Sequence, residues 1–248
     1  MRTLLVILLF CCVGPAYSTI DMGLLGFYRT KPIAGGLQAN AGYNQLIWGD
    51  KGAKPLYGFV RPNATVFTAG QYNAYAYEAE FWPISFLGVE YGSEKIFNNG
   101  IYQDYDCETF QCQTEFRNTY LKYNLLLGYS LFYFKGTIRK QTVEASDKSK
   151  DFIFPQIGSA LNRGEDEIES RELTFGLNFG YYNLIYQDIK SDIEIRKNKH
   201  RIRTIILSLD TNPFKTYISY GRFISHQIDS HFIAGALTMS FGETLKLD

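Results

Sequence analysis

The chain has no net charge, little histidine or tryptophan, and no apolar run long enough for a spanning helix. Lysine plus arginine and aspartate plus glutamate each number 25, so nucleic acid is not a favoured partner. Three histidines and four cysteines leave few metal ligands, and no glycine-rich phosphate loop or clustered ligand motif occurs, so no cofactor is implied. A membrane-spanning helix needs roughly twenty apolar residues, and no such stretch is present.

The first residues resemble a secretory signal peptide. Arg2 supplies a positive charge, Leu4–Val13 is an apolar run, and Ala16–Ser18 places small residues where a signal peptidase reads them. We therefore expect residues 1–18 to be a signal peptide, cut before Thr19, and residues 19–248 to form a single domain. A lipoprotein signal ending at Cys11 is the alternative, and the bulky Phe10 argues against it.

Two cysteines remain after that cleavage, Cys107 and Cys112. An even number of cysteines in an exported chain predicts a disulfide, which here would close a short loop outside a strand. The alternative is a pair of metal ligands, but no histidine or further cysteine lies nearby in the sequence.

What the chain does have is alternation with a period of two. In 172–181 every odd position is apolar or aromatic and every even position is polar or glycine. In 232–241 the odd positions from Ile233 to Phe241 are apolar or glycine and alternate with smaller or more polar residues. Side chains of a strand point alternately to its two faces, so each strand has one apolar face and one polar face.

The same pattern and the turn residues between segments predict a chain of strands, and we see no second domain. Pro32 and Gly35–Gly36 interrupt the first two strands, so ten strands plus an N-terminal plug is a competing count. The candidate strands are 22–31, 37–48, 56–66, 72–82, 85–96, 113–127, 130–142, 168–180, 182–195, 200–210, 214–225 and 230–241.

The connections predict an orientation. Short ones, such as 83–85 and 211–213, alternate with longer or more polar ones, such as 98–113 and 144–167. Short periplasmic turns that alternate with long outer loops are typical of bacterial outer-membrane barrels, and an even strand number places both chain ends in the periplasm.

The mature chain resembles the outer-membrane β-barrel proteins of Gram-negative bacteria as a class, over nearly its whole length. The signal, the alternating strands and an apolar closing strand that ends in Phe241 carry this resemblance, although Gly242–Asp248 follow the aromatic residue. It implies an all-β fold, a closed antiparallel transmembrane β-barrel of about ten to twelve strands, in the cell outer membrane. The expected partners are outer-membrane lipid, lipopolysaccharide and the barrel assembly machinery. An exported soluble β-sandwich is the structural alternative.

A barrel of this size predicts a narrow, porin-like channel for passive transport, or a structural barrel. The polar inner face favours the channel, and we expect Thr174, Asn178 and Asp188 to line the lumen. Enzymatic activity is not the favoured interpretation.

Two short motifs nevertheless resemble the active site of the omptin proteases, which are outer-membrane barrels. Asp104 and Asp106 form a D-x-D pair in one predicted outer loop, and Asp229 and His231 form a D-x-H pair in another. The resemblance implies that Asp229 and His231 activate a water molecule opposite the other two carboxylates. The competing interpretation is solvated loop carboxylates.

Barrel lipases offer a second enzymatic alternative, since they pair a histidine and a serine on one strand face. Here Ser225–His226 and Ser230–His231 are adjacent in sequence and point to opposite faces, which disfavours a dyad.

Two further segments invite an interpretation. A basic run of Arg196, Lys197, Lys199, Arg201 and Arg203 at an outer turn is able to pair with lipopolysaccharide phosphates, or is a solvated hairpin tip. The apolar centre of 151–161, inside the longest loop, should leave water by folding into the lumen, packing on the rim or touching a neighbour.

Overall fold

A computed structural model describes residues 18–31, 33–49, 56–99, 106–157, 159–195, 197–225 and 229–242. No helix in these ranges has the length and apolar character needed to cross a membrane. The strands are β1 (Ser18–Thr30), β2 (Ile33–Gly49), β3 (Tyr57–Ala69), β4 (Tyr72–Ile84), β5 (Leu87–Asn98), β6 (Glu115–Tyr129), β7 (Phe132–Ala145), β8 (Phe152–Phe154), β9 (Ser159–Leu161), β10 (Glu165–Asn178), β11 (Tyr182–Ile193), β12 (Lys199–Thr211), β13 (Phe214–Ile224) and β14 (Asp229–Phe241).

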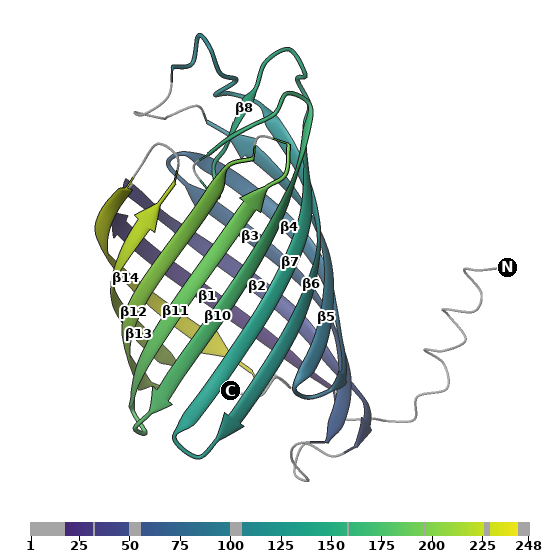
Figure 1. Cartoon of the computed structure of the whole chain (residues 1–248). Helices are drawn as coiled ribbons and strands as arrows, with labels where there is room; N and C mark the ends of the chain where they lie inside the picture. The colour runs from purple at the N-terminus through teal and green to yellow at the C-terminus, as the bar shows by residue number, and fades with distance from the viewer. Residues whose placement is uncertain are drawn as a thin grey trace, which may run out of the picture.

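Across the described residues, twelve of these strands close into one antiparallel barrel, and β8 and β9 form a separate hairpin (Figure 1). The order around the barrel is β1-β14-β13-β12-β11-β10-β7-β6-β5-β4-β3-β2. Closure is made by β1 and β14, which pair from Met22↔Phe241 to Arg29↔Ala234. The predicted closed all-β barrel is confirmed at its upper strand count, and the alternative of ten strands plus an N-terminal plug is wrong.

The two faces of the strands follow the alternation in the sequence. Leu173 and Phe175 are 47% and 56% exposed, whereas Thr174 between them is 6% exposed. In β14, Ile233 is 57% exposed and its neighbour Phe232 is 5% exposed. Apolar side chains therefore point outward and polar or small ones inward, the reverse of a soluble barrel with a closed apolar core.

The chain turns tightly at the end of the barrel where β1 starts and β14 ends. Turns such as 85–86 and 130–131 lie there, whereas the long β5–β6 and β7–β10 connections lie at the opposite end, where Figure 1 shows β8. We refer to this opposite end as the outer end. The alternation of short and long connections does not hold for the first four strands. At the outer end, residues 31–32 and 70–71 are short connections, and at the opposite end β2 and β3 are separated by residues 50–56.

Inward glycines let large aromatic side chains lie flat along the barrel wall. A Cβ atom built on Gly92 would overlap the ring of Tyr120 on β6, and one built on Gly176 would overlap the ring of Tyr133 on β7. These glycines allow the close approach that packs an aromatic ring against a neighbouring strand. The inner wall is thus shaped by glycine–aromatic pairs as well as by polar side chains.

Candidate functional site

The barrel encloses a cavity of about 860 Å³. Acidic and basic side chains line it together, among uncharged polar and a few apolar ones. Its charged lining residues are Glu78, Glu80, Glu90, Glu94 and Glu172, with Arg29, Arg61, Lys122, Lys135 and Arg139.

Arg61 is the centre of the first charge network in the lumen. Its guanidinium donates to both oxygens of Asp21 on β1, at 2.6 and 2.9 Å, and to Glu80 on β4 at 2.5 Å. Asn44 and Trp82 donate to the same two carboxylates, at 2.5 and 3.0 Å. Buried charges need partners of this kind, because an unpaired one carries a large desolvation cost. The network joins the inner faces of β1, β2, β3 and β4.

A second network surrounds Lys122 on β6. Its ammonium pairs with Glu90 and lies 3.8 Å from Glu78. The hydroxyl of Tyr120 donates to Glu78, which also accepts a hydrogen bond from Asn63 at 2.7 Å. Two carboxylates therefore share one lysine here, and hydrogen-bond donors from β3 and β6 compensate the excess negative charge.

One more carboxylate, Glu172 on β10, extends the polar lining toward β7 and β11. Glu172 accepts hydrogen bonds from Gln187 at 3.0 Å and Thr174 at 3.1 Å, and pairs with Lys135 at 3.2 Å. Thr174 was a predicted lumen residue, and the structure places it on the inner face. The guanidinium of Arg139 lies 4.1 Å from the ring centroid of Tyr120, a cation–π contact.

The lumen is asymmetric. Charged residues gather on β3–β7 and β10, and β1 adds Asp21 and Arg29, whereas the inner face of β14 carries small or neutral residues from Ala234 to Ser240. Between those two charges, Gly23 and Leu25 of β1 continue the uncharged wall beside β14. A solute in the cavity therefore meets fixed charges mainly from one side.

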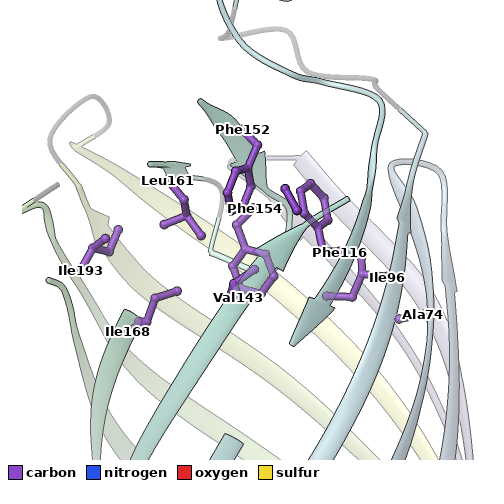
Figure 2. Packing of buried hydrophobic residues seen from close by; sticks show 10 residues of the cluster. Ala74, Ile96, Phe116, Val143, Phe152, Phe154, Leu161, Ile168 and Ile193 are labelled. Carbon is purple, nitrogen blue, oxygen red and sulfur yellow. The ribbon is translucent and has the colours of Figure 1, made fainter. Parts of the chain in front are cut away.

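The β8–β9 hairpin caps one half of the outer mouth (Figure 2). Phe152, Phe154 and Leu161 are fully buried against inward residues at the outer ends of β4, β5, β6, β7, β10 and β11. Figure 2 shows Val143 and Phe116 directly beside the two phenylalanines. Of the alternatives left open for 151–161, packing into the barrel mouth is the one observed.

A short disulfide loop lies against the other side of this hairpin. Cys107 and Cys112 are bonded, as predicted. Cys112 packs with Ile153 and Ala160, and Phe110 contacts the same cluster. The backbone of Gln111 donates to Asp151 at 2.8 Å and accepts from Ile153 at 3.3 Å. The hairpin is thus held between the barrel wall and the disulfide loop.

At the opposite end of the barrel, an aromatic cluster narrows the lumen beside β2, β3 and β4. Tyr57, Phe59 and Trp82 are buried there together with Leu46, and Leu126 packs against them. The rings of Phe59 and Trp82 stack with centroids 5.7 Å apart. The polar cavity therefore lies between two apolar clusters. Inward folding of 151–161 was one of the alternatives that the sequence left open, whereas the aromatic cluster was not predicted.

The structure does not assemble the omptin-like site. Asp104 lies outside the described residues, and Asp106 accepts hydrogen bonds from Thr109 and the Glu108 amide, which lower the pKa of its carboxyl. Asp229 and His231 share the outward face of β14 with Ile233, and β14 lies across the ring from β6.

Both residues of that predicted D-x-H pair are engaged on the outer surface instead. Asp229 forms an exposed ion pair with Arg222 at 2.7 Å. His231 stacks on Tyr220, whose hydroxyl lies 2.8 Å from its Nδ1 atom. This side of the predicted constellation faces away from the lumen, so it has no access to a solute inside the barrel.

One histidine that sequence reasoning did not single out does face the lumen. His200 on β12 is buried, lies opposite Ser191 on β11, and has its ring 6.0 Å from that of Phe223. Neither ring nitrogen has a hydrogen-bond partner among the described residues, so His200 and Ser191 are not a bonded dyad. His226, from the lipase alternative, lies outside those residues. Within the described ranges no group of histidine, cysteine, aspartate and glutamate side chains could hold a metal ion.

The predicted basic run lies at the outer end of the barrel. Lys197 and Lys199 are exposed in the β11–β12 turn and at the start of β12, and Arg196 lies outside the described residues. Arg201 and Arg203 follow on the outward face of β12.

The prediction that Asp188 lines the lumen is wrong. It has the same parity in β11 as the exposed Leu184 and Tyr186, so it faces outward, and Arg201 binds its carboxylate at 2.5 and 2.9 Å. From Asp188 toward the outer end of β11 the outward positions are charged, so a polar side chain there no longer indicates the lumen. Asn178, the other predicted lumen residue, has the same parity in β10 as the inward Thr174.

The outward face decides the class of protein. Its apolar and aromatic side chains cover strands all around the closed barrel, far beyond the single patches of a soluble protein. The residues include Leu24, Leu37, Val66, Tyr77, Phe81, Tyr91, Tyr123, Leu127, Phe175, Tyr186, Leu207, Ile218 and Leu237. The chain is a transmembrane β-barrel. A closed barrel leaves no unpaired edge in lipid, and this architecture belongs to the outer membrane. The soluble β-sandwich alternative is wrong.

No protein-family model and no curated protein matches the chain. Among solved structures it is similar to the KdgM porin, with 10% identity, a TM-score of 0.49 and coverage of 89% of this chain and 99% of that one. For the NanC porin the values are 10%, 0.47, 88% and 98%. An outer membrane channel from Pseudomonas putida F1 gives 8%, 0.49, 92% and 97%. The fold assignment itself follows from the strand pairing.

Proposed function

We propose that this barrel is a narrow channel for the passive passage of small polar solutes, with an outer mouth that the β8–β9 hairpin narrows. The observation that carries the proposal is the cavity of about 860 Å³, lined by acidic and basic side chains inside a closed barrel. Such a lining is compatible with water and disfavours a lumen filled only for stability.

The paired charges also indicate what kind of solute would pass. Arg61, Lys122 and Lys135 each lie beside a carboxylate, so the lining has no strong excess of either sign. Selectivity in a pore depends on its width and on the charges and hydrogen-bonding groups along it. We therefore expect weak ion selectivity and passage of uncharged or zwitterionic polar molecules.

Single-channel recording in planar bilayers tests the proposal. The purified protein should conduct, and replacement of residues 152–161 by a Gly–Ser linker should raise the conductance severalfold, because the apolar hairpin leaves the mouth. A Gly–Ser replacement of 147–150, which is mostly exposed and precedes β8, is the matched control and should conduct like the parent.

Two outcomes would contradict the proposal, the first its channel and the second its narrowing of the mouth by the hairpin. One is the absence of conductance in both the parent and the hairpin variant, which would leave a structural barrel. The other is a conductance that the hairpin replacement does not change, which would place the narrowest part elsewhere, for example at the aromatic cluster of Phe59 and Trp82.

We also propose that the barrel assembly machinery reads the closing strand β14. Its outward positions from Ile233 to Phe241 are apolar or glycine, and Phe241 pairs with Met22 at the closure. Substitution Phe241→Ser should reduce the yield of heat-resistant barrel in the outer membrane, whereas Phe214→Ser, on the outward face of β13, should leave that yield closer to the parent. Equal yields for both variants would contradict the proposal.

A further inference from the structure

The outward face of β10–β13 changes character toward the outer end. Apolar residues such as Phe175, Tyr186 and Ile205 occupy its middle, and charged residues replace them within one or two outward positions. These charged residues, with Lys140 at the adjoining end of β7 and Asp229 at that of β14, form the outer charge band: Lys140, Glu169, Arg171, Asp188, Lys190, Asp192, Lys199, Arg201, Arg203, Arg222 and Asp229. The exposed carboxylates Glu165 and Glu167 of β10 lie farther out on the same face.

One row of this band places three cations side by side. Arg171 on β10 pairs in register with Lys190 on β11, and Lys190 pairs with Arg201 on β12. All three have the outward parity of their strands, so their side chains are direct cross-strand neighbours. Like charges directly opposite each other on one face destabilise a sheet, so the row needs negative charge from elsewhere.

The adjacent row repeats the arrangement. Arg203 on β12 lies in register with Arg222 on β13, and with Asp188 on its other side. Asp188 would be the obvious partner for Arg203, but both oxygens of that carboxylate already accept hydrogen bonds from Arg201. Arg203 thus faces an arginine on one side and an occupied carboxylate on the other.

The carboxylates of the band are committed to other cations. Glu169 binds Arg171 at 2.6 Å, Asp192 lies 3.9 Å from Lys199, and Asp229 binds Arg222 at 2.7 Å. Among the described residues, Lys190 and Arg203 form no hydrogen bond or ion pair, and both side chains are exposed. The band therefore presents two cations on adjacent strands that have no ion-pair partner of their own, and Asp188, already bound by Arg201, is the carboxylate whose charge acts on both.

The position of the band identifies what it faces. It lies directly above Tyr186 and Tyr220, and amphipathic aromatic residues of this kind mark the boundary between hydrocarbon and headgroups. It is at the outer end of the barrel, so it meets the headgroups of the outer leaflet. Phosphates attached to lipid would come to this height with their acyl chains against the apolar face below.

We propose that the outer charge band binds the phosphate groups of the phosphorylated glycolipid of the outer leaflet, with Lys190 and Arg203 as its principal cations. Arg171, Arg201 and Arg222 contribute as neighbours that already have a carboxylate partner. The inference extends the predicted lipopolysaccharide contact of the basic run to a site shared by four strands, and it does not depend on the barrel being a channel.

Native mass spectrometry of the purified barrel with added bis-phosphorylated lipid A tests the site directly. The Lys190→Gln/Arg203→Gln variant should bind this lipid about thirtyfold more weakly, because each of the two basic residues at an anionic surface contributes about 1 kcal/mol. Lys95→Gln is the matched control, since Lys95 is an outward cation on β5, across the barrel, and is paired with Glu115. It should bind like the parent.

Thermal unfolding supplies a second readout, because the difference in stability between the parent and the double variant should depend on whether lipid A is present. Without lipid A, in an uncharged detergent, the double variant should unfold at a higher temperature than the parent, because like-charge neighbours have been removed. With lipid A the parent should gain more stability than the variant, since a ligand stabilises the folded state it binds.

Each of these experiments has an outcome that would overturn the proposal. Unchanged lipid A binding in the double variant, or equal weakening in Lys95→Gln, would overturn the proposal. Inorganic phosphate alone should give no comparable stabilisation of the parent, and dephosphorylated lipid A should bind much more weakly. If free phosphate reproduced the effect, the band would be a general anion site and the assignment to a glycolipid would be wrong.

Discussion

At the scale of single residues, the stability of the lumen depends on a few charged side chains that each bind several side chains of opposite charge. Arg61 joins Asp21 and Glu80 from strands on either side of its own. Each of the three side chains is at most 12% exposed, so their charges are largely shielded from bulk water. In such a setting, the loss of one partner leaves the others with uncompensated charge.

We expect Arg61→Met to destabilise the barrel by about 3 kcal/mol, because two buried carboxylates lose their shared cation. Urea unfolding in detergent micelles measures this change. Lys95→Gln, which removes one partner of the exposed Lys95–Glu115 pair, should leave the unfolding midpoint unchanged. A loss of stability of the same size in both variants would show that the Arg61 network has no special role.

The same substitution should also alter permeation. Without Arg61 the lining retains its carboxylates, so the channel should become more selective for cations. Reversal potentials measured in a salt gradient across a planar bilayer would reveal this shift. Conductance with an unchanged reversal potential would indicate that permeating ions do not pass near Arg61.

Glycine positions provide a second residue-scale test. In Gly92→Ala the new methyl group would overlap the ring of Tyr120, which donates to Glu78, so the ring must move away from its carboxylate. We expect a cost of about 1–3 kcal/mol from this overpacking. Gly235→Ala is the control, because its nearest atom, the Tyr217 carbonyl oxygen, is 3.8 Å from the added methyl. Similar unfolding curves for the two variants would contradict the tight fit at Gly92.

At the scale of elements, the hairpin and the disulfide loop form one unit. The loop between Cys107 and Cys112 supplies both hydrogen bonds to the segment before and within β8 and an apolar contact to Ile153. In Cys107→Ser/Cys112→Ser we expect faster amide hydrogen exchange at Ile153 and more frequent conductance fluctuations. Exchange at Val143, on the barrel wall, should stay unchanged. Equal protection of Ile153 with and without the disulfide would rule out this support.

Strand positions could be predicted from the sequence because the hydrocarbon imposes a strict alternation on the middle of each strand. All twelve candidate strands overlap the observed ones, and the inward and outward faces of 172–178 and of β14 are as predicted. The alternation loses its meaning in the outer half of β11, where the outward positions Asp188, Lys190 and Asp192 are charged. Asp188 was misplaced for this reason.

The candidate site was harder to predict. Which charges meet in the lumen depends on the register between strands distant in sequence, as with Asp21 and Arg61, and no local pattern encodes that register. The neighbouring cations of the outer charge band also depend on the register between strands, so they could not be predicted either. The apolar character of 151–161 did predict that this segment leaves water, but not the half of the mouth that it covers.

At the scale of the whole molecule, the fold predicts which surfaces are accessible from outside the cell. A single cysteine introduced as Lys148→Cys, in the long connection after β7, should react with a membrane-impermeant maleimide in intact cells, because it lies at the outer end. Tyr181→Cys, in the exposed turn between β10 and β11, should react only after the outer membrane is opened. Labelling of Tyr181→Cys in intact cells would reverse the orientation.

The half-coverage of the mouth has a consequence for the route of any permeating molecule. The hairpin rests on the arc from β4 to β11, which largely coincides with the arc that carries the lumen charges. A molecule arriving from outside would therefore travel off-axis, along the uncharged wall of β14, with Arg29 at the outer end of β1 beside it and most of the carboxylates and guanidinium groups on its opposite flank. Such unequal flanks would rotate a dipolar molecule into a preferred heading before it reached the far exit.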